Sequence, residues 1–169
     1  MTRGTIAFVD FDKETQKWYI YNSTEFNGDM GPDMSSGEKL LKIDFRDIFY
    51  NENNLKSMKE KLQQVVIKTI KRFGYDDEYD EKPEFSDLFD QHELELDILD
   101  LATNKSDFWS NYFNYSDWGY IVNISNKPFT VVDEKGKRVK LLPKDRSVLC
   151  LYFANAEYFY NPTTSLTEV

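Results

Sequence analysis

Aspartates near the N-terminus have side chains and a spacing that could hold a metal ion. Asp10 and Asp12 end the first apolar segment, and Asp29 and Asp33 belong to a loop rich in glycine and other turn-forming residues. Hard divalent cations take clustered carboxylate oxygens on flexible loops, so this set would suit a small metal-dependent hydrolase or nuclease. The spacing does not reproduce an EF-hand loop, however. We keep the set as candidate metal ligands and expect no bound cofactor.

The single histidine, His92, and the single cysteine, Cys150, are the other residues with chemically reactive side chains. Histidine has an unperturbed pKa near neutrality, so a general base would be His92 or a carboxylate or lysine with a shifted pKa. His92 falls on the apolar side of an expected helix, which favours a partly buried structural role. Cys150 lies in the apolar run Val148–Leu151 and is expected to be a small buried hydrophobe. We therefore assign no catalytic residue.

Acidic residues are concentrated between Asp76 and Asp100, where Lys82 is the opposing charge. One interpretation is a solvated face that keeps the protein soluble, and another is that the basic face of helix 54–73 neutralises part of the cluster. A third is a docking surface for a basic cleft, with attraction that speeds association and makes it salt-sensitive. The third interpretation predicts contacts by Asp76, Asp77, Glu78, Asp80, Glu81, Glu84, Asp87, Asp90 and Glu93.

Strands are predicted at both ends of the chain. Residues 5–21 are expected to form an antiparallel hairpin around the polar segment 12–17. Both faces of its first strand are apolar, which indicates neighbouring strands on either side. Asp133–Gly136 is predicted to be a hairpin turn, with glycine where a positive φ is needed. The other strands are predicted over residues 118–124, 129–132, 138–142 and 148–153.

Apolar residues recur at intervals of three and four in the middle of the chain, which is typical of amphipathic helices. The clearest helix is predicted over residues 54–73, and its exposed face is basic. Others are predicted over 37–45, 84–99 and 107–113, with His92 on the apolar face of the second. The order of strands, helices and strands predicts an α+β fold. Its sheet would be mainly antiparallel and built from the N- and C-terminal strands, with the central helices packed on one face.

Length and charge restrict the organisation and the partners. The 169 residues are expected to form a single domain over residues 1–160, followed by a polar tail over 161–169. The net charge of −9 argues against direct binding to nucleic acid. We identify no signal peptide and no membrane-spanning run, and a single cysteine excludes an internal disulfide. We therefore expect a cytoplasmic protein without a membrane partner.

Short segments of the chain resemble known families. Asp10–Asp12 resembles the start of the nucleophile motif of haloacid-dehalogenase-like phosphatases, but Glu14 stands where those enzymes have threonine. Thr2–Ala7 and the loop Glu25–Asp29 resemble a loose family of small proteins from bacteriophages and other mobile elements. That resemblance implies an accessory role in the contest between phage and host, such as inhibition of a CRISPR or restriction nuclease. It transfers no catalytic residue.

The function predicted from these observations is that of a non-enzymatic, acidic protein-binding module. Its partner would be the basic surface of a nucleic-acid-handling defence protein in a bacterial host, which the acids would engage in the manner of a DNA mimic. Two alternatives stay open. One is the metal-dependent hydrolase or nuclease that uses the loop carboxylates. The other is a structural or assembly protein, for which a symmetric apolar patch would be the sign.

Overall fold

The structure is a computed structural model. The described residues are 3–23, 26–27, 30–42, 57, 60–61, 64, 89–143, 148–153, 157–160 and 167–168. Their elements are β1 (Arg3–Asp12), β2 (Lys17–Ser23), β3 (Phe26–Asn27), α1 (Ser35–Leu41), β4 (Phe89–Leu94), β5 (Ile98–Asp100), α5 (Leu101–Tyr112), β6 (Trp118–Asn123), β7 (Phe129–Val132), β8 (Arg138–Leu141), β9 (Leu149–Tyr152), β10 (Glu157–Tyr160) and β11 (Thr167–Glu168).

Strand β1 lies inside the larger sheet. Within the described residues this sheet, called sheet A, has seven strands in the order β10-β9-β6-β1-β2-β4, with β3 also paired to β1. β1 runs antiparallel to β2, with Phe8 opposite Tyr21, and parallel to β6. Residues 4–10 are all buried. The prediction that the first strand has neighbours on both sides is therefore confirmed.

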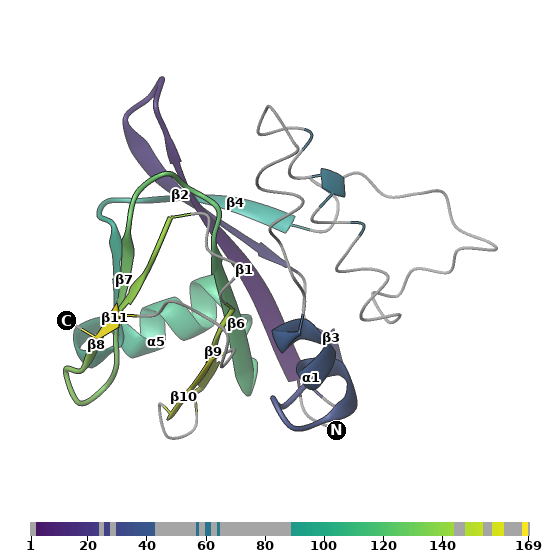
Figure 1. Cartoon of the computed structure of the whole chain (residues 1–169). Helices are drawn as coiled ribbons and strands as arrows, with labels where there is room; N and C mark the ends of the chain where they lie inside the picture. Colours follow the sequence, from purple (N-terminus) through teal and green to yellow (C-terminus); the bar gives the residue numbers. More distant parts are fainter. Residues whose placement is uncertain are drawn as a thin grey trace.

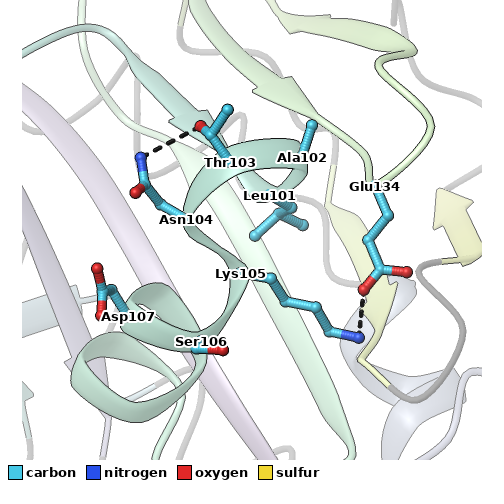
Figure 2. Close-up of a pocket in the computed structure, with 8 residues that line it drawn as sticks. All are labelled: Leu101, Ala102, Thr103, Asn104, Lys105, Ser106, Asp107 and Glu134. Carbon is cyan, nitrogen blue, oxygen red and sulfur yellow. Dashed lines mark hydrogen bonds and ion pairs between the residues drawn. The ribbon is translucent and has the colours of Figure 1, made fainter.

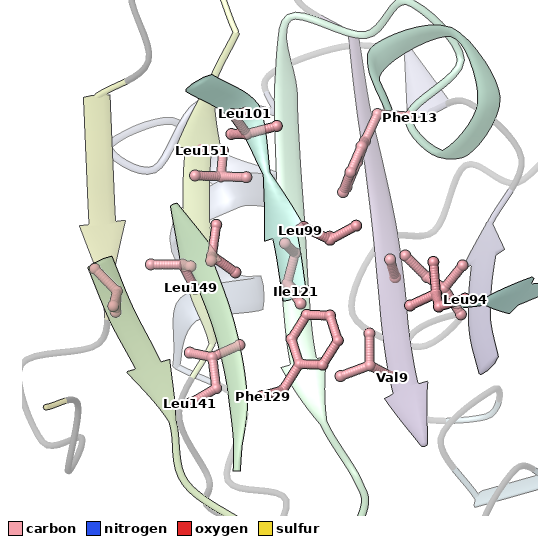
Figure 3. Packing of buried hydrophobic residues seen from close by; sticks show 14 of the residues in the cluster. Val9, Leu94, Leu99, Leu101, Phe113, Ile121, Phe129, Leu141, Leu149 and Leu151 are labelled. Carbon is pink, nitrogen blue, oxygen red and sulfur yellow. The ribbon is translucent and has the colours of Figure 1, made fainter. Parts of the chain in front are cut away.

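A smaller sheet covers one face of sheet A and encloses the main core. Among the described strands, sheet B has four in the order β11-β8-β7-β5. Its inner residues and those of sheet A form one apolar cluster. The ring of Trp18 on sheet A lies 5.4 Å from that of Phe129 on sheet B, measured between centroids. Figure 3 shows Phe129 in this cluster between Val9 and Leu141. The sequence predicted one sheet, and the second was not anticipated.

Helices α1 and α5 lie on either side of β1 and β6 (Figure 1). Phe113, which ends α5, belongs to the cluster between the sheets. α1 packs over the other face, where a Cβ on Gly37 would lie 2.5 Å from the Tyr120 hydroxyl. The α+β class with mainly antiparallel strands is confirmed. The described helices do not share one face, because β1 is apolar on both and each face needs a cover.

Most of the predicted elements occur close to their predicted positions. Strands β6, β7, β8 and β9 match the predictions for the final third of the chain. Gly136 has φ of 84°, and Asp133 Oδ1 accepts backbone hydrogen bonds from Lys135 and Lys137 in the predicted turn. The helices predicted over 37–45 and 107–113 correspond to α1 and α5. Of the helix predicted over 54–73, the described residues 57, 60, 61 and 64 are helical.

The helix predicted over residues 84–99 is wrong where the structure describes it. Residues 89–94 form β4 and 98–100 form β5. β4 pairs along β2 with His92 opposite Ile20, so sheet pairing overrides the helical periodicity. Residues 92–97 also alternate between acidic and other side chains, with leucine at positions 94 and 96, a period of two that favours a strand.

Substitution of Phe129 tests how much the contact between the two sheets contributes to the stability of the fold. Its side chain is fully buried in the cluster between them. We expect Phe129→Ala to lower the free energy of unfolding by about 3–5 kcal/mol, because it removes apolar burial and leaves a cavity. The matched control is Thr130→Ala on the outer face of the same strand, expected to cost less than about 1 kcal/mol. Urea unfolding measures both, and equal losses would contradict this account of the core.

Replacing each of two buried asparagines by valine is expected to change the free energy of unfolding in opposite directions. Asn22 is buried on β2, and among the described residues its Oδ1 finds no hydrogen-bond donor. The Nδ2 of Asn123, also buried, donates to the carbonyls of Lys127 and Leu141 at 2.8 and 3.0 Å. We expect Asn22→Val to raise the free energy of unfolding by about 1–2 kcal/mol and Asn123→Val to lower it, because only the second breaks existing bonds. Urea unfolding that shows a loss for both variants would refute the claim about Asn22.

Candidate functional site

Strand β4 lies at the edge of sheet A and carries part of the predicted docking surface. Among the described strands it pairs with β2 alone, and an edge strand is a template for contact with another chain. Asp90 and Glu93 are both exposed on it. They point to opposite faces because side chains alternate along a strand, so a partner that approaches the edge would meet both. The other predicted contacts, at positions 76–87, lie outside the described residues.

The loop after β4 adds acids and an exposed apolar side chain. Glu95 and Asp97 are exposed, and Leu96 between them is 63% exposed. The predicted helix would have buried Leu96, but the end of β4 at Leu94 leaves it in solvent. Alternation around Leu96 was the signal in the sequence that could have indicated this. The acidic strip is defined here as Asp90, Glu93, Glu95 and Leu96.

The acidic strip keeps a negative potential. Lys17 on β2 places its Nζ 3.3 Å from Glu93 Oε1, but both side chains are about half exposed, at 51% and 53%. Solvent screens such a pair, which contributes little to stability. Burial raises the pKa of Tyr112 on α5, and the carboxylates of Asp107 and Glu95 raise it further. Glu95 of the acidic strip is therefore one of the charges that oppose ionisation of the neighbouring Tyr112 hydroxyl.

The candidate metal ligands do not form a site in the described part of the chain. Asp10 is buried in β1 opposite Tyr19. Asp12 Oδ1 accepts a hydrogen bond from the Glu14 amide at 2.9 Å, which caps the hairpin turn. Asp33 is exposed before α1, and Asp29 lies outside the described residues. No group of three or more His, Cys, Asp or Glu side chains among the described residues is placed to bind a metal ion.

His92 and Cys150 are too far apart to act together. They belong to β4 and β9, which are four strand positions apart in sheet A, or roughly 19 Å at the usual spacing of strands. Cys150 pairs with Tyr120 on the face that α1 covers, whereas His92 pairs with Ile20 on the face towards sheet B. The His92 ring lies edge-on to Tyr112 with centroids 5.3 Å apart. It is a half-buried packing residue, on a strand where a helix was predicted.

Burial makes the Cys150 thiol a poor nucleophile. It raises the pKa of the thiol, and a hydrogen bond with the Tyr120 hydroxyl only partly offsets the increase. Burial also raises the pKa of Tyr120 itself, whose hydroxyl donates to the Met30 carbonyl. Both groups are held in their neutral forms, whereas nucleophilic attack by cysteine requires the thiolate. The structure agrees with the expectation of a buried, hydrophobic cysteine.

A polar hollow beside α5 has a volume of about 350 Å³. Residues 101–107 and Glu134 line it, and α5 is kinked there at Asn104. Figure 2 shows that Lys105 forms an ion pair with Glu134 on one side, while Asn104 bonds to Thr103 on the other. Four of the polar side chains that line the hollow are thus paired with one another, and the two pairs lie on opposite sides of it. The hollow therefore lacks the arrangement of a catalytic centre.

Comparison with known proteins yields no relative. No family model matches the chain, and no curated protein or solved structure matches it significantly. The candidate site therefore rests on the geometry of β4 and its loop.

The neutral forms of the buried groups predict a loss of stability in alkali. The thiol of Cys150 and the hydroxyl of Tyr120 ionise near their ordinary pKa values of 9.0 and 10.0 when unfolded, but at higher pH when folded. Their contribution is complete below pH 9 and is lost as the pH rises above it. We expect the free energy of unfolding to fall as the pH rises above 9, because the unfolded chain then releases the thiol proton that the folded chain keeps.

Urea unfolding of the wild type and Cys150→Ala across this pH range measures the effect. The variant should show a smaller decrease, whatever its stability at pH 7, because it has no thiol to ionise. Parallel curves for the two proteins would contradict the assignment.

Proposed function

We propose that this chain is a non-enzymatic protein-binding module whose acidic strip docks onto the basic surface of a nucleic-acid-handling protein. The observation that carries the proposal is Leu96, an exposed apolar side chain between exposed acids at the end of an edge strand. Interfaces are commonly built from a few buried apolar anchors within a charged rim. Leu96 would enter an apolar recess of the partner, and the acids would face its Lys and Arg side chains.

Charge and backbone geometry support the same arrangement. The chain has 30 acidic residues against 21 basic ones, so its long-range field attracts a basic partner and speeds encounter. The edge of β4 supplies backbone donors and acceptors that a strand of the partner can extend. The N-terminal resemblance to phage and mobile-element proteins supports an inhibitor of a host defence nuclease, acting in the bacterial cytoplasm as a DNA mimic. Among the described helices, none is long and apolar enough to cross a bilayer.

Charge reversal on the strip tests the proposal. We expect Asp90→Lys with Glu93→Lys to abolish capture of the partner, because both changes replace attraction by repulsion. The matched control is Asp33→Lys with Glu38→Lys, which makes the same change in net charge around α1, where both residues are exposed. Tagged proteins are incubated with a bacterial lysate at low salt and then at raised salt, and eluates are identified by mass spectrometry.

The expected result is one nucleic-acid-binding protein retained by the wild type and the control, and lost by the strip variant and at raised salt. Thermal midpoints of all three proteins should agree within a few degrees, since the changed residues are exposed. If the strip variant and the wild type recover the same proteins, β4 is not the contact.

A further inference from the structure

A second hollow lies on the outer side of sheet B and has the opposite charge to the acidic strip. Its volume is about 360 Å³. The lining residues come from the loop before β5, the segment before β7, and strands β7 and β8. They are Asp97, Lys127, Pro128, Thr130, Arg138 and Lys140. We call this hollow the basic groove.

The sheet register brings the cations of the basic groove together. Val131 and Val139 are paired across β7 and β8 and are buried in the core. Their neighbours therefore point outward, and Thr130 stands directly opposite Lys140 on that face. Arg138 is two residues from Lys140 on the same strand, so the two side chains are neighbours.

Lys127 is held in place at the end of the basic groove. Its carbonyl accepts hydrogen bonds from Asn123 Nδ2 and Ser125 Oγ, both at 2.8 Å. Its Nζ lies 3.9 Å from the centroid of the Phe11 ring, in a cation–π contact. Buried asparagine and serine side chains thus fix the segment that carries this cation, before any ligand binds.

Two of the three cations of the groove have no ion-pair partner among the described residues. Elsewhere in the described residues, lysines 17, 42 and 105 form ion pairs with glutamates. Within the same part of the chain, the side chains of Arg138 and Lys140 form neither an ion pair nor a hydrogen bond, although Asp97 lines the same groove. Neighbouring like charges repel, so a bound anion would relieve the repulsion.

We propose that the basic groove binds the phosphate group of a small phosphorylated molecule. The Arg138 guanidinium is suited to bidentate bonds with phosphate oxygens, and the ammonium groups of Lys140 and Lys127 add charge. Thr130 supplies a hydroxyl donor. Asp97 repels long polyanions and accepts a hydrogen bond from a ligand hydroxyl or amine. The volume falls within the usual range for small-molecule sites and exceeds what a free phosphate ion needs.

Calorimetric titration of the full chain at low ionic strength tests this site. The probes are adenosine monophosphate, ribose 5-phosphate, inorganic phosphate, adenosine and a short single-stranded oligonucleotide. At least one organic phosphate should bind more tightly than inorganic phosphate, and adenosine should not bind. Arg138→Gln with Lys140→Gln should weaken that binding at least tenfold. The control, Lys39→Gln with Lys42→Gln, removes the same charge from exposed positions at α1 and should bind as the wild type does.

Thermal melts without ligand establish that both double variants are folded. The proposal would be overturned if none of the phosphate probes bound to the wild type. It would also be overturned if the Arg138→Gln, Lys140→Gln variant bound them as tightly as the wild type does. Equal affinity for inorganic phosphate and the organic phosphates would overturn the choice of a larger ligand. Tighter binding of a single-stranded oligonucleotide, lost in the groove variant, would assign the groove to a polymer instead. The residues tested are separate from the acidic strip, so failure here leaves the proposed docking function standing.

Discussion

Burial of both faces of β1 is the constraint on which the rest of the structure depends. One face packs against sheet B and the other lies under α1, and β6 and β2 occupy its two edges. Ionisable side chains occur in this strand only near its ends, where Arg3 is exposed, Asp10 is the last buried residue and Asp12 is half-buried. In the strand order of sheet A, β1 and its neighbour β6 take the two central positions. The polar chemistry of the molecule is consequently displaced to its periphery.

The acidic and the basic side chains at the periphery lie in different places. The acids lie on an edge strand of sheet A, and the cations lie on the outer face of sheet B. Among the described strands β4 has one partner and lies at the edge of sheet A, so acids are accommodated on both of its faces. β7 and β8 have one buried face, so their cations are all directed outward on the other. Asp97 lies where these regions meet. An acidic protein thereby carries a basic groove that its net charge does not reveal.

The sequence predicts elements whose local pattern agrees with their tertiary environment. The β1–β2 hairpin, the turn at Gly136 and the strands of the final third have such patterns, and so does α5 around Phe108 and Tyr112. Residues 89–99 fail this test because their apolar spacing suits both a helix and a strand, and pairing with β2 decides between them. The acids of β4 were identified from composition alone. The basic groove was not identified, because alternation along β8 shows which side chains share a face but not that a hollow forms there, and Asp97 reaches it only through the parallel pairing of β5 with β7.

Parallel pairing of β1 with β6 also governs how the chain can fold as it is synthesised. The backbone amide of Arg3, at the start of β1, bonds to Asp117, just before β6, across a sequence separation of 114 residues. At ribosomal rates of about 5–20 residues per second, β1 emerges roughly 6–23 s before its parallel neighbour. During that interval β2 can cover only one edge of β1, and the other is an apolar template for misassembly. Such long-range contacts also slow folding after release, so a nascent chain is the form of this protein most in need of chaperones.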